Sequence, residues 1–218
     1  MTFKIVDVRH PLRSKLARRL AKWAKAYMAK RPPDFVIGKP ENPYLLRWWV
    51  LPRNRVFNIY LHLFMRSDDD RALHDHPWWN ASFVLDGGYV EHMPKWRYGC
   101  TSGPSAGNTI VLDPQEAWRR TAPGGDLAGW EFIGYEMQQS YPVRRWPGDF
   151  VARWATNAHR VQLNSFSGIA GEVPCVSLFL TGPRLRKWGF YCEQGWVHSK
   201  DFISVRPGGN DVGKGCDQ

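Results

Sequence analysis

The sequence predicts an all-β fold, an antiparallel barrel or sandwich preceded by one helix. From residue 44 onward, short apolar and aromatic runs alternate with turns rich in glycine and proline. No helical pattern separates these runs, as it would in a parallel sheet. Aromatic residues make up 14% and hydrophobic residues 43% of the 218 residues, a composition typical of strands packed around a substantial core.

The helix is expected within an amphipathic arm, residues 1–40. Proline suits the first turn of a helix at residue 11, and Pro32 and Pro33 end the pattern. Large apolar residues recur at spacings of three or four and therefore share one helical face: Leu12, Leu16, Leu20, Trp23 and Tyr27. We expect residues 12–28 to be helical, with Leu16, Leu20 and Trp23 packed on the β body.

The arm also carries most of the net charge. Residues 1–31 hold ten Lys or Arg and one Asp, a charge of +9, whereas the remaining 187 residues hold 20 basic and 19 acidic residues. Two interpretations explain this pattern: a packed helix with a solvent-exposed basic face, or an arm that binds nucleic acid or an anionic membrane surface. The aromatic residues lie on the apolar stripe instead of among the charges, which favours the packed helix.

The body, residues 41–205, is expected to form the strands. They are predicted at 44–51, 55–65, 73–76, 80–85, 89–93, 109–112, 131–137, 150–154, 160–163, 175–180 and 188–191. Asp86-Gly87-Gly88 predicts a hairpin turn. Residues 95–129 hold six Gly and three Pro and are expected to be an inserted loop, and residues 206–218 a flexible tail.

Four widely spaced cysteines without a Cys-x-x-Cys pair argue against a zinc ribbon and a disulfide-stapled secreted domain. Cys175 and Cys192 are expected to be small core residues. No run approaches the roughly 20 apolar residues of a membrane span, and no apolar segment follows the basic start as in a secretory signal. These features predict a soluble cytoplasmic protein.

The strongest chemical signal is His74-Asp75-His76-Pro77. In a strand, residues i and i+2 point to the same side, so both imidazoles can reach one metal ion while Asp75 points away. Pro77 cannot continue a strand ladder and turns the chain, which brings Asn80 back beside the pair. The segment is therefore a candidate metal site.

The spacing His74-x-His76, three residues, Asn80, six residues, Gly87 resembles the first motif of the cupin superfamily, in which Glu usually stands at the position of Asn80. Pro147-Gly148 followed by His159 resembles the second motif, with a longer interval. The runs LHDHPWWN, GGYVEH, RRWPGD, TGPR and KWGFYCEQGWVH together resemble an uncharacterised cupin-like family of phage and prophage genomes.

The resemblance implies a cupin-type antiparallel barrel, also described as a double-stranded β-helix or jelly roll. It suggests His74, His76 and His159 as ligands of a divalent transition metal, Fe(II) first, with Zn, Mn or Ni as alternatives. Three neutral imidazoles leave coordination positions open for water, substrate or oxygen. Asn80 replaces the usual carboxylate, so we expect it as a weak ligand or a hydrogen-bond partner of a metal-bound water.

Two further residues are catalytic candidates. With a two-residue hairpin loop, Glu91 shares the inward face with Asn80 and Ser82, as a general base, an orienting carboxylate or an ordinary rim residue, whereas a three-residue loop points His92 inward instead. Arg184 follows a strand end and is placed to hold a carboxylate or phosphate at the barrel mouth. The expected pocket-lining residues are Tyr60, His62, Trp78 and Ser82.

The leading functional hypothesis is an Fe(II)-type dioxygenase or hydroxylase acting on a small molecule, or on a modified nucleotide or sugar. A second hypothesis is a non-catalytic ligand-binding or sensor module whose basic arm docks to nucleic acid or a protein. A third is a sugar-nucleotide epimerase or isomerase, which needs a general base in place of metal chemistry. The sequence leaves a homodimer open.

Overall fold

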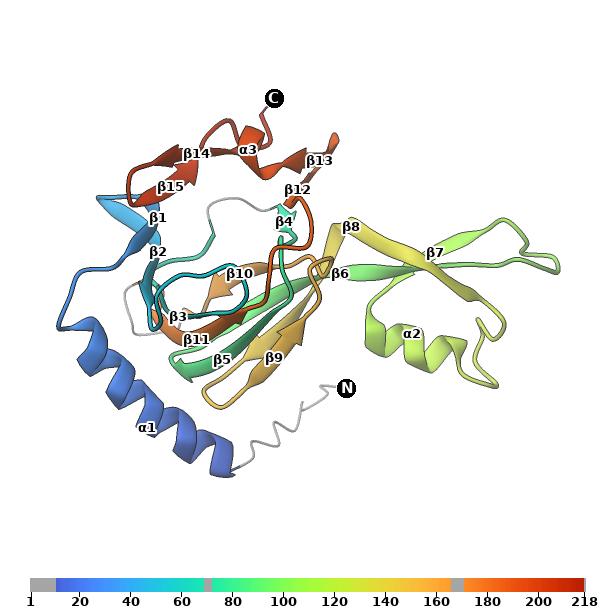
Figure 1. Cartoon of the computed structure of the whole chain (residues 1–218). Helices are drawn as coiled ribbons and strands as arrows, with labels where there is room; N and C mark the ends of the chain where they lie inside the picture. The colour runs from blue at the N-terminus through green and yellow to red at the C-terminus, as the bar shows by residue number, and fades with distance from the viewer. Residues whose placement is uncertain (1–10, 69–71, 166–170, 218) are drawn as a thin grey trace.

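The computed structural model describes residues 11–68, 72–165 and 171–217 (Figure 1). Its largest unit is a curled, eight-stranded sheet that is antiparallel except where β15 runs parallel to β1. In spatial order its strands are β14 (Ile203–Arg206), β15 (Gly209–Val212), β1 (Phe35–Lys39), β2 (Asn42–Trp49), β3 (Asn58–Phe64), β11 (Cys175–Thr181), β5 (Asn80–Asp86) and β9 (Phe150–Arg153).

Two smaller sheets complete the β body. In the first, β6 (Tyr89–Gly99) pairs with β10 (Arg160–Leu163), β7 (Thr109–Leu112) and β8 (Glu131–Arg145). In the second, β12 (Gly189–Cys192) lies between β13 (Gly195–His198) and β4 (Leu73–His74), and the short helix α3 (Ser199–Phe202) follows β13. The predicted all-β class with an N-terminal helix is confirmed, although the three sheets do not close into one continuous barrel.

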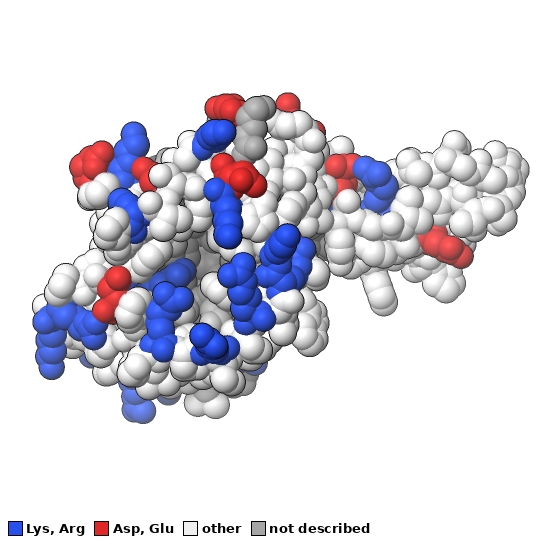
Figure 2. Space-filling view, turned by 45° about the horizontal axis from the view of Figure 1, so that its top comes forward, with Lys and Arg blue, Asp and Glu red and all other residues white. Residues whose placement is uncertain are grey.

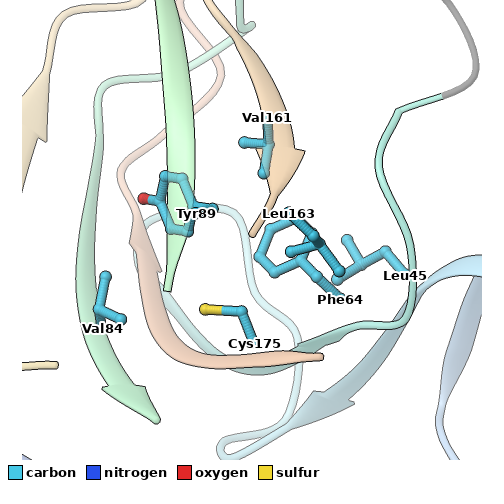
Figure 3. Close-up of a cluster of buried hydrophobic side chains, with 7 residues drawn as sticks. All are labelled: Leu45, Phe64, Val84, Tyr89, Val161, Leu163 and Cys175. Carbon is cyan, nitrogen blue, oxygen red and sulfur yellow. The ribbon is translucent and has the colours of Figure 1, made fainter. Parts of the chain in front are cut away.

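The main core lies between the large sheet and the β6 sheet. Seven buried side chains from six strands meet there (Figure 3): Leu45, Phe64, Val84, Tyr89, Val161, Leu163 and Cys175. On β3 the alternation of side chains follows the pleat, because Tyr60 and His62 face inward while Leu61 belongs to the core on the outer face. The central strands of the large sheet, β2, β3, β11 and β5, are therefore covered on both faces, which suits their nearly continuous apolar sequences.

The outer face is covered by α1 (Pro11–Met28), but not by the residues that the apolar stripe predicted. Leu16 and Trp23 are 51% and 41% exposed, whereas Ala17 and Ala24 are fully buried. Ala21 and Ala24 join the core under the helix, with Leu20, Tyr27 and Met28 packed against it. The expectation for Leu16 and Trp23 is wrong because small alanines let the helix approach the sheet more closely than large side chains allow. Residues 1–10 of the predicted arm lie outside the described residues.

The turn at Asp86-Gly87-Gly88 does not form the predicted hairpin. The strand before it, β5, pairs with β11 and β9, and the strand after it, β6, pairs with β10, β7 and β8. The chain therefore crosses from one sheet to another at these glycines. Gly87 has φ 73°, and a Cβ there would come within 2.3 Å of the Pro174 carbonyl oxygen, so glycine is required both for its conformation and for the close approach.

Residues 95–129 form structure instead of a loop. A projection extends from the body (Figure 1). It is built from the outer halves of β6 and β8, the strand β7 and the helix α2 (Pro114–Thr121). The Asp113 side chain caps α2 by accepting a hydrogen bond from the Glu116 N–H. This excursion has its own small core around Tyr98, Leu112 and Leu127.

The predicted tail is also integrated into the body. Strand β15 pairs in parallel with β1 through Val36 and Gly209, and Cys216 forms a disulfide with Cys192, at a Cα–Cα distance of 5.5 Å. The expectation that Cys192 is simply a small core residue is therefore wrong. Cys192 and Cys216 are 24 residues apart in the sequence, and no local motif identifies them as a pair.

Within the described ranges, none of the helices has the length and apolarity needed to cross a membrane.

The packing of α1 leads to a specific prediction for stability. Ala24→Leu is expected to destabilise the protein by about 1–3 kcal/mol, because the added methyl groups have no space at a fully buried site. Both residues favour helix, so propensity contributes little. Urea denaturation measures the change.

Leu16→Ala serves as the matched control and should change the unfolding free energy by no more than about 0.5 kcal/mol. The reverse order, with Leu16→Ala the more damaging variant, would show that the large apolar residues dock the helix after all.

Candidate metal centre

Two distant segments are joined at the candidate site by a pair of backbone hydrogen bonds. The His74 N–H donates to the His159 carbonyl oxygen and the His159 N–H donates to the His74 carbonyl oxygen, each at 3.0 Å. His76 is held by a further bond from its N–H to the Ala155 carbonyl oxygen, also at 3.0 Å. This reciprocal pairing sets the imidazole of His74 on β4 beside that of His159, the residue that precedes β10.

The three predicted metal-ligating histidines converge in space. Their ring centroids are 5.3 Å apart for His74 and His76, 5.2 Å for His74 and His159, and 5.1 Å for His76 and His159. One nitrogen from each ring can be chosen so that all three lie within 4.8 Å of one another. The Nε2 atoms of His76 and His159 are 2.8 Å apart. This arrangement is that of a three-imidazole ligand set.

A buried carboxylate orients one of these rings. Glu91 on β6 is fully buried, and its Oε1 lies 2.8 Å from Nδ1 of His159. A neutral His159 that donates from Nδ1 to Glu91 carries its lone pair on Nε2, the nitrogen that faces His76. Glu91 thereby selects the tautomer and the ring orientation that metal binding requires.

Two arginines neutralise the same carboxylate. Arg153 on β9 donates from Nε to Oε1 of Glu91 at 2.7 Å, and Arg145 on β8 donates from Nε to Oε2 at 2.7 Å. Burial raises the pKa of Glu91, but the hydrogen bond from His159 and the charges of Arg153 and Arg145 outweigh it and hold the pKa well below its usual range. Glu91 is therefore a fixed anion and not a proton donor at neutral pH.

The imidazoles themselves are kept neutral. Burial, followed by the proximity of His159 and Arg153, lowers the pKa of His74 to about 3. The pKa of His76 is lowered well below its usual value by burial and by the other two rings, and that of His159 by burial and by Arg153. A neutral imidazole offers a lone pair, so the site is ready for a cation at physiological pH.

Asp75, the residue between His74 and His76, faces the other way, as the His-x-His spacing predicts, although the predicted strand 73–76 extends only to His74. Asp75 is fully buried and accepts hydrogen bonds from the Gly189 N–H at 2.8 Å, from Arg186 and from the Tyr191 hydroxyl at 3.3 Å. These bonds tie the histidine segment to β12. The strand alternation thus separates a polar anchor behind the chain from the imidazoles in front of it.

The imidazoles open into a cavity of about 320 Å³. Most of its wall is aromatic or aliphatic, and three positions come from the C-terminal segment that was expected to be a loose tail: Asn210, Asp211 and Val212. An apolar cavity with a few polar groups is typical of a small-molecule site.

The structure places the other predicted site residues at different distances from this cavity. Tyr60, His62 and Trp78 line it. Ser82 and Asn80 are buried outside its lining, and Oδ1 of Asn80 lies 3.5 Å from the Arg153 guanidinium. Glu91 also lies behind the cavity wall. Arg184 is exposed and outside the lining, and its neighbour Arg186 makes the ion pair with Asp75.

Several residues of the site were not found by sequence reasoning. Arg145 belongs to the run RRWPGD, which contributed only to the family resemblance, and Arg153 belongs to none of the quoted runs. Only the pairing of β8, β9 and their neighbours brings the two arginines to Glu91. Phe179 and Arg47 lie on strands that the sequence did identify. The alternation of those strands contained the relevant signal, because both residues fall on the same face of the sheet as His62.

No protein-family model matches this sequence, and no curated protein matches it either. Among solved structures, the chain is similar to the DMSP lyase DddQ from Ruegeria pomeroyi DSS-3, with 13% identity, a TM-score of 0.36 and coverage of 72% of this chain. The chain matches only 53% of the length of that lyase.

The chain is also similar to an uncharacterised conserved protein with a double-stranded β-helix domain from Klebsiella pneumoniae. The identity is 14% and the TM-score 0.36, and the match covers 70% of this chain and 89% of that protein. Hydroquinone 1,2-dioxygenase PnpCD, solved with Cd²⁺ and 4-hydroxybenzonitrile, matches at 15% identity and a TM-score of 0.31, covering 85% and 84%. These similarities transfer no activity, metal or substrate to this chain.

The buried histidines predict a loss of stability in acid. The unfolded chain binds protons near pH 6.5, whereas folding keeps His62, His74, His76 and His159 neutral to lower pH. The unfolding free energy should therefore decrease as the pH falls below about 6.5, by up to about 1.4 kcal/mol per pH unit for each histidine. Glu91 adds to the loss below pH 4.5, its ordinary pKa.

Urea denaturation of chelator-treated protein between pH 7.5 and 5 measures this slope. Chelation is needed because a bound metal would add its own pH dependence. Equal unfolding free energies across this range would mean that the imidazoles are not held neutral in the folded state.

Proposed function

We propose that this protein is a mononuclear, metal-dependent enzyme of cupin type, whose His74, His76 and His159 hold a divalent transition metal at the wall of a small-molecule cavity. The observation that carries the proposal is the convergence of three neutral imidazoles, with ligand nitrogens within 4.8 Å of one another, beside a cavity of about 320 Å³. Fe(II) is the first candidate for the metal, with Zn, Mn and Ni as alternatives.

The imidazole nitrogens are better arranged to coordinate a metal ion than to form hydrogen bonds with one another. Nδ1 of His74 is buried without a hydrogen bond, and the Asp68 carboxylate oxygen near it is 3.9 Å away. With Nδ1 of His159 donating to Glu91, its Nε2 lone pair faces the Nε2 of His76. A cation at this point would accept lone pairs from all three rings.

Residues of this chain have separable roles in such a site. Glu91, fixed by Arg153 and Arg145, orients His159 and is a positioning residue because it lies behind the cavity wall. The aromatic side chains exclude water from the substrate. Glu91 lies behind the cavity wall and is not placed to act as a general base, and the exposed Arg184 lies outside the lining, where it does not hold a group of a molecule in the cavity.

The proposed reaction is oxidation of a small molecule by dioxygen. A bound Fe(II) would supply the one-electron and dioxygen chemistry that no amino-acid side chain provides. Three neutral ligands leave positions open for both reactants. A modified nucleotide or sugar is one substrate class that the cavity would admit.

Metal analysis tests this proposal. Protein purified without affinity-tag metal and then incubated with one equivalent of Fe(II) under anaerobic conditions should retain about one ion per chain after desalting. His76→Ala should lower that ratio to near zero while the far-ultraviolet circular dichroism stays unchanged. His92→Ala is the matched control, because His92 pairs with Gln162 outside the cluster and its loss should leave the ratio unchanged.

The two parts of the proposal fail separately. Wild-type protein that retains no transition metal, whichever ion is offered, would reject the metal site. Stoichiometric metal without oxygen consumption over a panel of candidate substrates would instead favour a non-catalytic ligand-binding or sensor protein. Oxygen uptake by the Fe(II)-loaded wild type but not by His76→Ala would support an oxygenase.

A further inference from the structure

A second polar group lines the cavity, away from the three histidines. Arg47 on β2 lies directly opposite His62 on β3, and its Nε donates a hydrogen bond to Nε2 of His62 at 2.9 Å. The guanidinium also lies over the Tyr60 ring, 4.9 Å from its centroid. These contacts hold the Arg47 side chain against the sheet, and among the described residues its two terminal NH₂ groups have no hydrogen-bond acceptor.

The pair adjoins the proposed metal centre. The Phe179 ring stacks on His62 at 4.7 Å between centroids and lies 6.4 Å from His76. Phe179 therefore separates the Arg47–His62 pair from the histidine cluster by one aromatic ring. All of these residues line the same cavity, so one small molecule can reach both groups.

The charge of Arg47 is not balanced by a protein carboxylate. Among the described residues, no Asp or Glu forms an ion pair with it. Asp34, whose N–H donates to the Arg47 carbonyl oxygen, directs its carboxylate to Arg31 and to the Trp49 N–H. Burial lowers the pKa of Arg47 only to about 10, so it remains cationic at neutral pH.

Further basic side chains lie near Arg47. Figure 2 shows Lys and Arg side chains gathered around a hollow on one face of the body. Arg53 also lines the cavity, with its guanidinium over the Trp49 ring, and the lining includes two acidic residues, Asp68 and Asp211.

We propose that Arg47, held in place by His62, is the recognition site for an oxyanion group of the substrate, so that the substrate class is a small organic acid with an apolar body. The guanidinium presents paired N–H donors that suit a carboxylate or a phosphonate. The aromatic wall suits the apolar part. This inference rests on the proposed function only in that the same substrate would also contact the metal. Anion binding at Arg47 itself does not require a metal.

Isothermal titration with three matched probes tests the oxyanion site: benzoate, phenylphosphonate and the neutral benzamide, each up to millimolar concentration. Chelator-treated wild-type protein should bind at least one of the two anions and bind benzamide at least tenfold more weakly. Arg47→Gln should weaken anion binding by about 10- to 100-fold, as loss of a charged hydrogen-bond pair implies. Tighter binding of benzoate or of phenylphosphonate identifies a carboxylate or a phosphonate substrate.

Matched variants separate the possible explanations. Arg119→Gln removes the same charge from an exposed position on α2 and should leave binding unchanged. Arg47→Lys keeps the charge but not the paired donors, so intermediate binding is expected even if Arg47→Gln folds poorly. The metal content of Arg47→Gln should equal that of wild type, and His76→Ala should still bind the anion.

Three results would overturn the inference. They are anion binding that survives Arg47→Gln, binding of benzamide as tight as that of benzoate, and no binding of either anion by the wild type. Loss of anion binding in His76→Ala, with binding retained in Arg47→Gln, would place the anion at the metal site. That result would reject the Arg47 subsite while leaving the metal proposal intact.

Discussion

The carboxylate of Glu91 is the group on which the arrangement of the site depends. It is completely buried, and an unpaired charge in such a place would cost several kcal/mol. Its oxygens are paired with Arg145 on β8, Arg153 on β9 and the ring of His159. Because these partners come from different strands, the need to neutralise one charge aligns the elements that carry the candidate metal centre.

In this network the charged side chains lie behind the cavity wall, and the neutral imidazoles with their lone pairs lie at the cavity surface. The ionised groups, Glu91, Arg145 and Arg153, lie behind the cavity wall, and Asp75 with Arg186 braces the histidine segment from its own far side. The imidazoles in front remain neutral because burial and nearby positive charge lower their pKa values. A cavity face with neutral ligands and fixed charges behind it can bind a metal without being altered by protonation near neutral pH.

The C-terminal segment shows why local sequence is a poor guide to the boundary of a fold. Residues after 206 are rich in Gly and polar residues, as many mobile tails are. In the structure, β15 completes the large sheet beside β1, Cys216 is bonded to Cys192, and Asn210 lines the cavity. A strand of this kind is stabilised by its neighbours, which a window of sequence does not contain. The same is true of residues 95–129, whose glycines punctuate strands and a helix instead of a loop.

The sequence by itself determined the features that depend on neighbouring residues. The alternation of apolar residues specified the strands and their faces, including the shared face of Tyr60 and His62, and the His-x-His spacing specified two imidazoles on one side of the chain. The tertiary structure decided which residues meet across long separations.

The tertiary structure brought Arg153 to Glu91, and the imidazole of His159 to those of His74 and His76. It also seated α1 through alanines because the closest helix–sheet approach favours small side chains. The period of a strand or helix determines which side chains share a face, but not which face is buried or which residues it contacts. Partners are chosen by strand order, by sheet crossing at Gly87 and Gly88, and by the requirement that every buried charge be neutralised.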